Sequence, residues 1–175
     1  VRMHCTNRIP HSRGLGSSAS AIVAGVTLAR ALIGDADVLR RQEILEIGSQ
    51  MEGHPDNVAP AVFGGATVSW MNEETSEVGS VRLTPPDDIH PVAFIPDFEL
   101  RTAAARAALP ATVPHGDASF NVARGALLAA VLSGNAQASG GVDLHSLLME
   151  ATRDRLHQEQ RRAAMEPSLA LVDWL

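Results

Sequence analysis

The stretch IPHSRGLGSSASAIVAG, residues 9–25, joins a segment rich in glycine and serine directly to an apolar run. From Ile22 to Ile33 the apolar residues recur at helical spacing, and Gly34 follows as a stop signal. A helix N-terminus leaves N–H donors free and carries a partial positive charge, and glycine lets an anion approach the backbone. The junction therefore predicts a helix that binds phosphate at its start. A helix that is merely capped by serine after a glycine turn is the structural alternative.

The same glycines match the dinucleotide fingerprint G-x-G-x-x-[GA], with Ala19 in the last place and Asp37 at about the expected distance beyond it. That fingerprint requires a strand that runs straight into the first glycine. Here the polar segment PHSR, residues 10–13, intervenes and begins with proline. A phosphate loop of another type is therefore favoured over a Rossmann site.

Composition narrows the classes of function. The chain has 175 residues, 45% of them hydrophobic, and a net charge of -6, which disfavours a nucleic-acid-binding face. All 14 basic residues are arginine, so a lysine Schiff base and the lysine-containing P-loop are excluded. The single cysteine, Cys5, fits a reducing compartment, and no apolar run reaches membrane-spanning length. We therefore expect a cytoplasmic protein that contacts neither nucleic acid nor membrane.

Between Gly34 and the next glycine stop, Gly53, the spacing predicts a second helix. Its cap would be Asp35 or Asp37. One face of this helix carries the apolar residues Ile44, Ile47 and Met51. Glu46 lies on the polar side, where a glutamate is ordinarily solvated. A magnesium ion between ATP phosphates needs oxygen ligands, commonly a carboxylate and a hydroxyl, so Glu46 is also a candidate ligand.

The segment EGHPDNVAPAVFGG, residues 52–65, gathers His54, Asp56 and Asn57 among two prolines and three glycines. It is too broken for a helix and too polar for a buried strand, and loop residues of these types often carry chemistry. A simple Asx-turn at Asp56 and Asn57 is the structural alternative.

The remaining pattern mixes strands and helices, which indicates an α+β fold. TPPDD, residues 84–88, marks a boundary because two prolines stop both helix and sheet. The expected strands lie within residues 1–9, 65–71 and 77–83, and HPVAFIP, residues 90–96, opens a second strand set. The expected later helices lie near residues 102–109, 118–133 and 143–160.

Several segments together resemble the GHMP small-molecule kinases. PHSRGLGSSAS, residues 10–20, is similar to their phosphate-binding motif, and its pairing with EGHPDN, residues 52–57, resembles the homoserine kinase branch. Three later segments are also similar to that branch: ELRTAAARAALP at 99–110, FNVARGALL at 120–128 and DRLHQEQR at 154–161. The resemblance covers most of the chain.

The resemblance implies ATP and Mg²⁺ as cofactors. The loop that would hold the ATP phosphates consists of Pro10, His11, Ser12, Arg13, Gly14, Leu15, Gly16, Ser17, Ser18, Ala19 and Ser20. Within this loop, Ser18 would supply the hydroxyl that contacts magnesium. Glu46 would supply the magnesium carboxylate, so the resemblance implies that these two side chains converge on one ion.

The resemblance also implies L-homoserine as the substrate, with its side-chain hydroxyl phosphorylated in threonine biosynthesis. The substrate residues would be His54, Asp56, Asn57, Thr102, Arg106 and Arg155, of which Asn57, Asp56 and Arg106 would act in catalysis. A guanidinium fits the carboxylate of an amino acid, and a carboxylate fits its ammonium group. Asn57 cannot accept a proton at neutral pH, so substrate positioning is favoured over base catalysis, with Asp56 as a base the alternative.

The fold that the resemblance implies has two domains with ATP in the cleft between them. Residues 1–86 would form an S5-like N-terminal domain, and residues 87–175 a ferredoxin-like C-terminal domain. An N-terminal strand motif and a late glycine-rich motif of the family are missing, so both domains would be incomplete and the chain an internal fragment. The resemblance leaves open whether the protein forms a homodimer. The alternatives are another GHMP kinase, acting on a sugar or a mevalonate-type alcohol, and a truncated, non-catalytic product that binds ATP.

Overall fold

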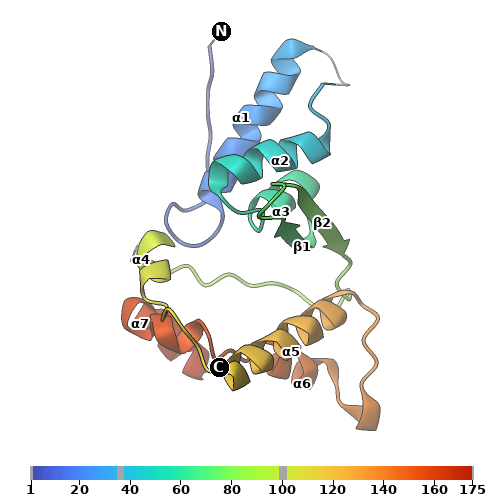
Figure 1. Cartoon of the computed structure of the whole chain (residues 1–175), viewed down its shortest axis with the longest axis vertical. Helices are drawn as coiled ribbons and strands as arrows, with labels where there is room; N and C mark the ends of the chain where they lie inside the picture. Colours follow the sequence, from blue (N-terminus) through green and yellow to red (C-terminus); the bar gives the residue numbers. More distant parts are fainter. Residues whose placement is uncertain (1, 35–37, 99–101, 175) are drawn as a thin grey trace. The chain divides into compact units, whose positions relative to one another are not determined.

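The computed structural model describes residues 2–34, 38–98 and 102–174 (Figure 1). Helices and a two-stranded sheet are both present, so the mixed α+β content expected from the sequence is confirmed. The chain divides into two compact units, Val1–Val81 and Arg82–Leu175.

The first unit contains three helices: α1 (Ser17–Ile33), α2 (Arg41–Glu52) and α3 (Val58–Phe63). It also contains the strand β1 (Ala66–Met71) and most of the strand β2 (Val78–Leu83). The two strands form the sheet, and the last two residues of β2 belong to the second unit. Both α1 and α3 pack against α2. The partly buried Met71 of β1 packs against the core of the unit. This core joins the three helices and β2 through one cluster of buried residues: Ala19, Leu45, Val58, Ala59 and Val78.

The glycine stops predicted from the sequence are confirmed. Gly34 follows α1 and Gly53 follows α2, both in the left-handed conformation that favours glycine. Their backbone N–H groups donate to carbonyls in the last turn of each helix. The expected caps Asp35 and Asp37 lie outside the described residues, and α2 begins after Arg40, where Glu43 accepts from the Arg40 backbone N–H at 2.6 Å.

The buried face of α2 agrees with the expected one at Ile44 and differs from it at Met51. Met51 is 63% exposed, whereas the buried positions of the helix are Ile44, Leu45, Gly48 and Ser49. The reason is that α1 and α3 both pack on this helix, so its contact surface is set by two neighbours and includes a small residue that lets one of them approach. The spacing of apolar residues cannot predict that a small residue such as Gly48 lies in the contact surface.

Two other expectations for this unit are corrected. The segment at residues 52–65 does contain a helix, the short α3, because Pro60 occupies its first turn, where no intrahelical N–H bond is lost. The described residues 2–9 form no strand. A strand needs a ladder partner, and the described part of the chain has only β1 and β2 paired in a sheet.

Gly48 is expected to be essential to packing in this unit. A Cβ atom at this position would lie 2.7 Å from Cγ1 of the fully buried Val58. Gly48→Ala should therefore lower the free energy of unfolding by about 1–3 kcal/mol, the usual cost of overpacking a core. Gly25→Ala in α1 is the matched control, because its Cβ would meet nothing within 4 Å. It should raise stability by about 0.5–1 kcal/mol through helix propensity. Urea unfolding of both variants tests the contrast, and equal shifts would contradict it.

The second unit is mostly helical. Its helices are α4 (Thr102–Ala107), α5 (His115–Leu132), the short 3₁₀ helix η1 (Ser139–Gly141), α6 (Leu144–Ala151) and α7 (Gln158–Trp174). The α5 and α6 helices pack together, and the buried apolar residues of the unit are Val131, Ala151 and Leu169. Within α7, Met165 departs from helical dihedral angles and Pro167 follows, which marks a kink.

Two expectations for the second unit are wrong. Residues 90–96 form no strand, although their composition favours one, because no partner strand lies beside them in the described part of the unit. The single helix expected over residues 143–160 is two helices, α6 and α7, with a break between Ala151 and Gln158. The break is stabilised by Asp154, which accepts hydrogen bonds from the backbone N–H groups of His157 and Gln158.

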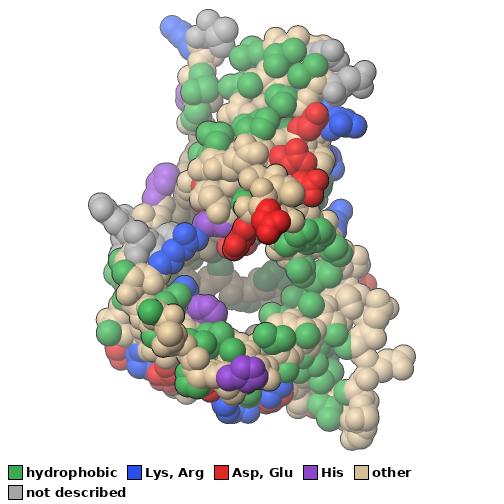
Figure 2. All heavy atoms as spheres, viewed as in Figure 1, with side chains coloured by type: hydrophobic (Ala, Val, Ile, Leu, Met, Phe, Trp, Pro, Cys, Tyr) green, Lys and Arg blue, Asp and Glu red, His purple; other side chains and the backbone are tan. Residues whose placement is uncertain are grey.

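Apolar side chains remain on the surface of the first unit. Leu28, Leu32 and Ile33 are exposed toward the end of α1, where Figure 2 shows hydrophobic side chains along the helix. In the portion of the chain that the structure describes, no helix combines the length and the apolar character that crossing a membrane requires.

Candidate functional site

The first turn of α1 has no side-chain cap. Gly16 occupies the N-cap position in the left-handed conformation, with φ 69°. Because glycine has no side chain, it cannot cap the first N–H groups of the helix. The first turn also carries no acidic side chain. The serine-capped alternative is therefore not what the structure shows, and the first N–H groups of α1 remain available as donors. This is the local geometry that phosphate binding requires.

A small polar network precedes the helix and includes a residue that the sequence motifs did not single out. Asn7 donates from Nδ2 to Oγ of Ser17 at 3.3 Å, and Oγ of Ser17 lies 3.1 Å from Nδ1 of His11. Arg13 donates from Nη1 to the His11 carbonyl at 3.3 Å. The network holds the glycine loop against the first turn of α1. Asn7 lay in an expected strand, and no local signal marks it as a partner of a serine ten positions later.

The loop between α2 and α3 lies beside the glycine loop. A Cβ atom on Gly16 would stand 3.0 Å from Oδ1 of Asn57, so the asparagine side chain packs directly against the glycine backbone. Asp56 organises this loop: its Oδ1 lies 2.5 Å from Nδ1 of His54 and accepts from the Asn57 backbone N–H at 2.7 Å. The fold therefore brings together two motifs that lie about forty residues apart in the sequence.

The side chains proposed for magnesium have different partners. Ser18 donates from Oγ to Oε2 of Glu52 at 2.8 Å. Glu46 accepts at Oε1 from Nε2 of Gln42 at 2.9 Å, and the same Gln42 group donates to the Val78 carbonyl. Three or more histidine, cysteine or acidic side chains nowhere gather into a metal cluster within residues 2–34, 38–98 and 102–174. A magnesium ion here would draw only a few ligands from the protein, which is its usual behaviour when phosphates complete the shell.

In the second unit, Arg155 is already engaged. Its Nη1 donates to Oδ1 of Asp117 at 3.4 Å, and its guanidinium carbon lies 4.0 Å from the centroid of the Phe120 ring. Its backbone N–H donates to Oδ1 of Asn121 at 2.9 Å. By contrast, Nε of Arg161 in α7 is buried and has no hydrogen-bond partner among the described residues. DRLHQEQR contains both arginines, and only the three-dimensional environment separates them.

The other two residues expected to contact substrate lie in α4. Arg106 is exposed in the last turn of this short helix. Thr102 is the first residue of α4, and its side chain lies outside the described part of the chain.

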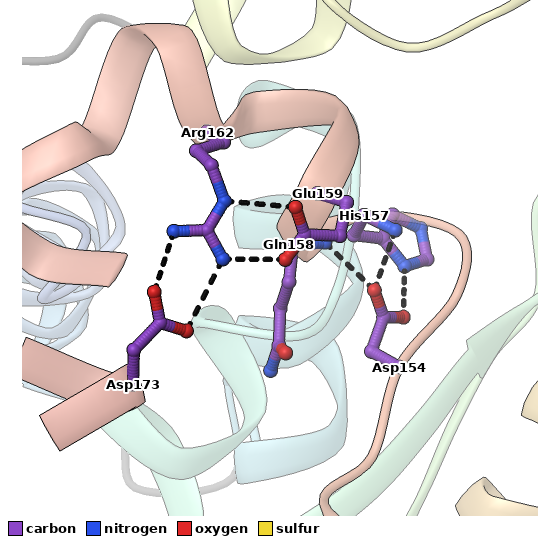
Figure 3. Close-up of polar contacts among 6 residues, drawn as sticks. All are labelled: Asp154, His157, Gln158, Glu159, Arg162 and Asp173. Atoms are coloured by element: carbon purple, nitrogen blue, oxygen red, sulfur yellow. Dashed lines mark hydrogen bonds and ion pairs between the residues drawn. The ribbon is translucent and has the colours of Figure 1, made fainter. Parts of the chain in front are cut away.

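Asp154 anchors the segment that carries both arginines (Figure 3). Its side chain is only 13% exposed. Burial by itself raises the pKa of this carboxyl, but the backbone N–H groups of Gln158 and His157 and the side chains of Asn121 and His157 outweigh that effect. The pKa of Asp154 therefore lies well below its usual range, and the carboxylate stays ionised while it caps α7. Farther along α7, Arg162 bridges Glu159 and Asp173 across the kink.

Asp154→Asn is expected to destabilise the protein by about 1–3 kcal/mol at neutral pH, because hydrogen bonds to a charged acceptor are lost. A depressed pKa in the folded state adds stability above the usual aspartate pKa of 3.8, and this stability is lost as the pH falls further. The difference between wild type and variant should therefore shrink below about pH 4. Thermal unfolding from pH 7 to pH 3 measures it, with the exposed Asp88→Asn as control. A difference independent of pH would refute the assignment.

Comparison with known proteins relates both units to one group of enzymes. The family described as GHMP kinases N terminal domain matches residues 1–65. The chain is 47% identical over 172 residues to a homoserine kinase from Streptomyces avermitilis and 46% identical to one from Streptomyces coelicolor. Each alignment covers 98% of this chain but only 53% and 52% of the relative, so the chain spans about half the length of the curated relatives it matches.

A solved structure shows the same fold. The crystal structure of a homoserine kinase from Cytophaga hutchinsonii superposes with a TM-score of 0.70 over 90% of this chain and 48% of that protein. The sequence identity is 24%, so this likeness concerns the fold.

Proposed function

We propose that the chain is part of an ATP-dependent kinase of the GHMP family that phosphorylates the side-chain hydroxyl of L-homoserine, because the family model of GHMP kinase N-terminal domains matches residues 1–65 and the relatives are homoserine kinases. The observation that carries the proposal is the contact between the two loops of the first unit. Asn57 packs on the backbone of Gly16, so a loop suited to an acceptor adjoins a loop suited to phosphate. Phosphoryl transfer depends mainly on such positioning and on stabilising charge on the phosphoryl oxygens.

The donor in this proposal is ATP with Mg²⁺. The N–H groups at the start of α1 would hold phosphate oxygens, and the loop from Pro10 to Ser20 would surround them. Ser18 and Glu46 stay the proposed magnesium residues. When bound, the ion would neutralise charge on the phosphates. The fit is supported by the donor set, which is a hydroxyl and a carboxylate, both oxygen ligands that magnesium prefers.

The acceptor residues have separate roles. His54 and Asp56 shape the acceptor loop, because the Asp56 carboxylate is occupied by His54 and by Asn57. Asn57 would orient the substrate hydroxyl. The engagement of Asp56 favours positioning over base catalysis, as the chemistry of Asn57 already did.

Arg106 of α4 would bind the homoserine carboxylate through a charge-assisted fork. Thr102 of the same helix would lie near the substrate hydroxyl and the path of the phosphoryl group. Arg155 stays the proposed second arginine on the substrate carboxylate, and Arg161 of the same segment is an alternative. Arg155 is held by Asp117 and Phe120, whereas Nε of Arg161 is buried without a partner among the described residues. A buried polar group of this kind ordinarily has a partner, and a carboxylate would supply one.

We also propose the finer domain assignment that the resemblance implied, with an S5-like domain over residues 1–86 and a ferredoxin-like domain over residues 87–175. The division into compact units at Val81 and Arg82 supports a boundary near this position.

The function is tested with the polypeptide encoded by the complete gene. Incubated with ATP, Mg²⁺ and L-homoserine, it should form ADP and O-phosphohomoserine in equal amounts, detected by a coupled assay and by mass spectrometry. Galactose and mevalonate serve as competing alcohol acceptors. Turnover of either in place of homoserine would move the protein to another branch of the GHMP kinases. The 175-residue chain by itself is tested in the same way for ATP binding and for turnover, because a non-catalytic product would bind ATP without forming O-phosphohomoserine.

A further inference from the structure

Glu52 contacts the phosphate loop although no motif assigns it a role. It is the last residue of α2, and Gly53 then turns the chain, with φ 88°, toward the acceptor loop. Its half-buried carboxylate accepts the Ser18 hydroxyl proton at Oε2 over 2.8 Å, across 34 positions of sequence. The contact links the end of α2 to the first turn of α1, where the proposed function places phosphate and metal.

This hydrogen bond determines what Ser18 can bind. A serine hydroxyl has one proton to donate and two lone pairs that accept. Because the Ser18 hydroxyl donates its hydrogen bond to Glu52, only its lone pairs remain for another partner. Lone pairs coordinate a cation, whereas a phosphate oxygen would need the proton. Ser17 differs, because its Oγ accepts from Asn7 and has no carboxylate partner among the described residues.

We propose that Glu52 is a positioning residue that orients the Ser18 hydroxyl toward the metal of the bound metal–ATP complex. The inference rests on the proposed function and adds a residue to it. A carboxylate that accepts a proton from a ligand makes the ligand oxygen a better donor to the metal, as outer partners of metal ligands generally do. The same negative charge beside the phosphate site disfavours ATP that carries no cation. Glu52 thereby makes the site selective for the metal complex.

The test compares ATP binding to the polypeptide encoded by the complete gene with Mg²⁺ present and with EDTA. For Glu52→Gln we expect affinity for Mg·ATP to fall about 10- to 100-fold, the usual effect of removing an outer partner of a metal ligand. Affinity for ATP in EDTA should stay unchanged or increase, because a repelling charge is gone. Isothermal titration calorimetry gives both constants, and electron paramagnetic resonance of Mn·ATP reports the bound metal directly.

Three further variants separate positioning from a general effect. Glu52→Asp keeps the charge but shortens the reach to Ser18, so it should weaken Mg·ATP binding without strengthening ATP binding in EDTA. Glu74→Gln removes the same charge from the exposed turn between β1 and β2 and should change neither constant. In a Ser18→Ala background, Glu52→Gln should have no further effect on Mg·ATP affinity, because the partner through which it acts is absent.

The outcomes are distinct. If wild type binds Mg·ATP and Glu52→Gln binds it equally well, the inference is wrong while the proposed function stands. If the variant loses affinity equally with Mg²⁺ and with EDTA, Glu52 has only a structural role and the inference is again overturned. If wild type binds ATP in neither condition, the proposed function and the inference fail together.

Discussion

Arg106→Ala is expected to lower kcat/KM for L-homoserine by about 30- to 1,000-fold, the largest effect of any substitution considered for this protein. A guanidinium that binds the substrate carboxylate makes a charge-assisted, often bidentate contact, and its loss leaves a poorly compensated charge. That loss is worth roughly 2–4 kcal/mol. The effect should appear mainly in the KM for homoserine. The KM for ATP should change little, because the phosphates are assigned to the loop before α1.

The measurement is steady-state kinetics on the polypeptide encoded by the complete gene, with both substrates varied. Arg82→Ala is the control, because it removes an exposed arginine from β2, away from any proposed contact. Arg161→Ala and Arg155→Ala form a second pair. Arg155→Ala should also raise the homoserine KM, and it should reduce stability as well, because Arg155 pairs with Asp117 and stacks on Phe120. Arg161→Ala tests the alternative assignment through the same homoserine KM. If Arg106→Ala leaves the KM for homoserine unchanged and raises the KM for ATP, Arg106 acts on ATP and its assignment to homoserine is wrong.

Gly16→Ala is expected to weaken ATP binding by about 30-fold or more. The residue has φ 69°, a conformation that costs an alanine roughly 1–2 kcal/mol. In addition, the new Cβ would lie 3.0 Å from Oδ1 of Asn57, so the acceptor loop must move, at a cost of about 1–3 kcal/mol. Both effects act on the two loops whose contact carries the proposed function.

Gly14→Ala separates the two contributions. Gly14 has φ 73°, but its Cβ would meet nothing within 4 Å. This variant should therefore show the backbone strain alone and bind ATP only about 5- to 30-fold more weakly. Calorimetric titration of the polypeptide encoded by the complete gene with Mg·ATP measures both variants, and circular dichroism confirms that each is folded. Equal losses for the two variants would mean that the approach of Asn57 to Gly16 is unimportant for binding.

The local signals in the sequence determined much of the first unit. Glycine and the apolar period placed the start and the end of α1, and Gly53 placed the end of α2, because a left-handed residue after a helix depends only on the residues beside it. The strands β1 and β2 were found for the same reason, since alternation between two turns is a local pattern. The phosphate loop followed from the chemistry of its own residues.

Other features depended on partners that are distant in the sequence. The face that α2 buries was set by α1 and α3, and residues 90–96 formed no strand because a strand needs a second strand beside it. Asp154 divided an expected single helix because its carboxylate could reach two N–H groups while Asn121 supported it from α5. The same holds within the candidate site. The sequence supplied Ser18, Asn57 and Arg155 as residue types. Only the tertiary structure decided that the Ser18 hydroxyl donates to Glu52, that Asn57 lies on Gly16 and that Arg155 pairs with Asp117. The physical reason is that hydrogen bonding and close packing act over a few ångströms in space, and the chain must fold before those neighbours exist.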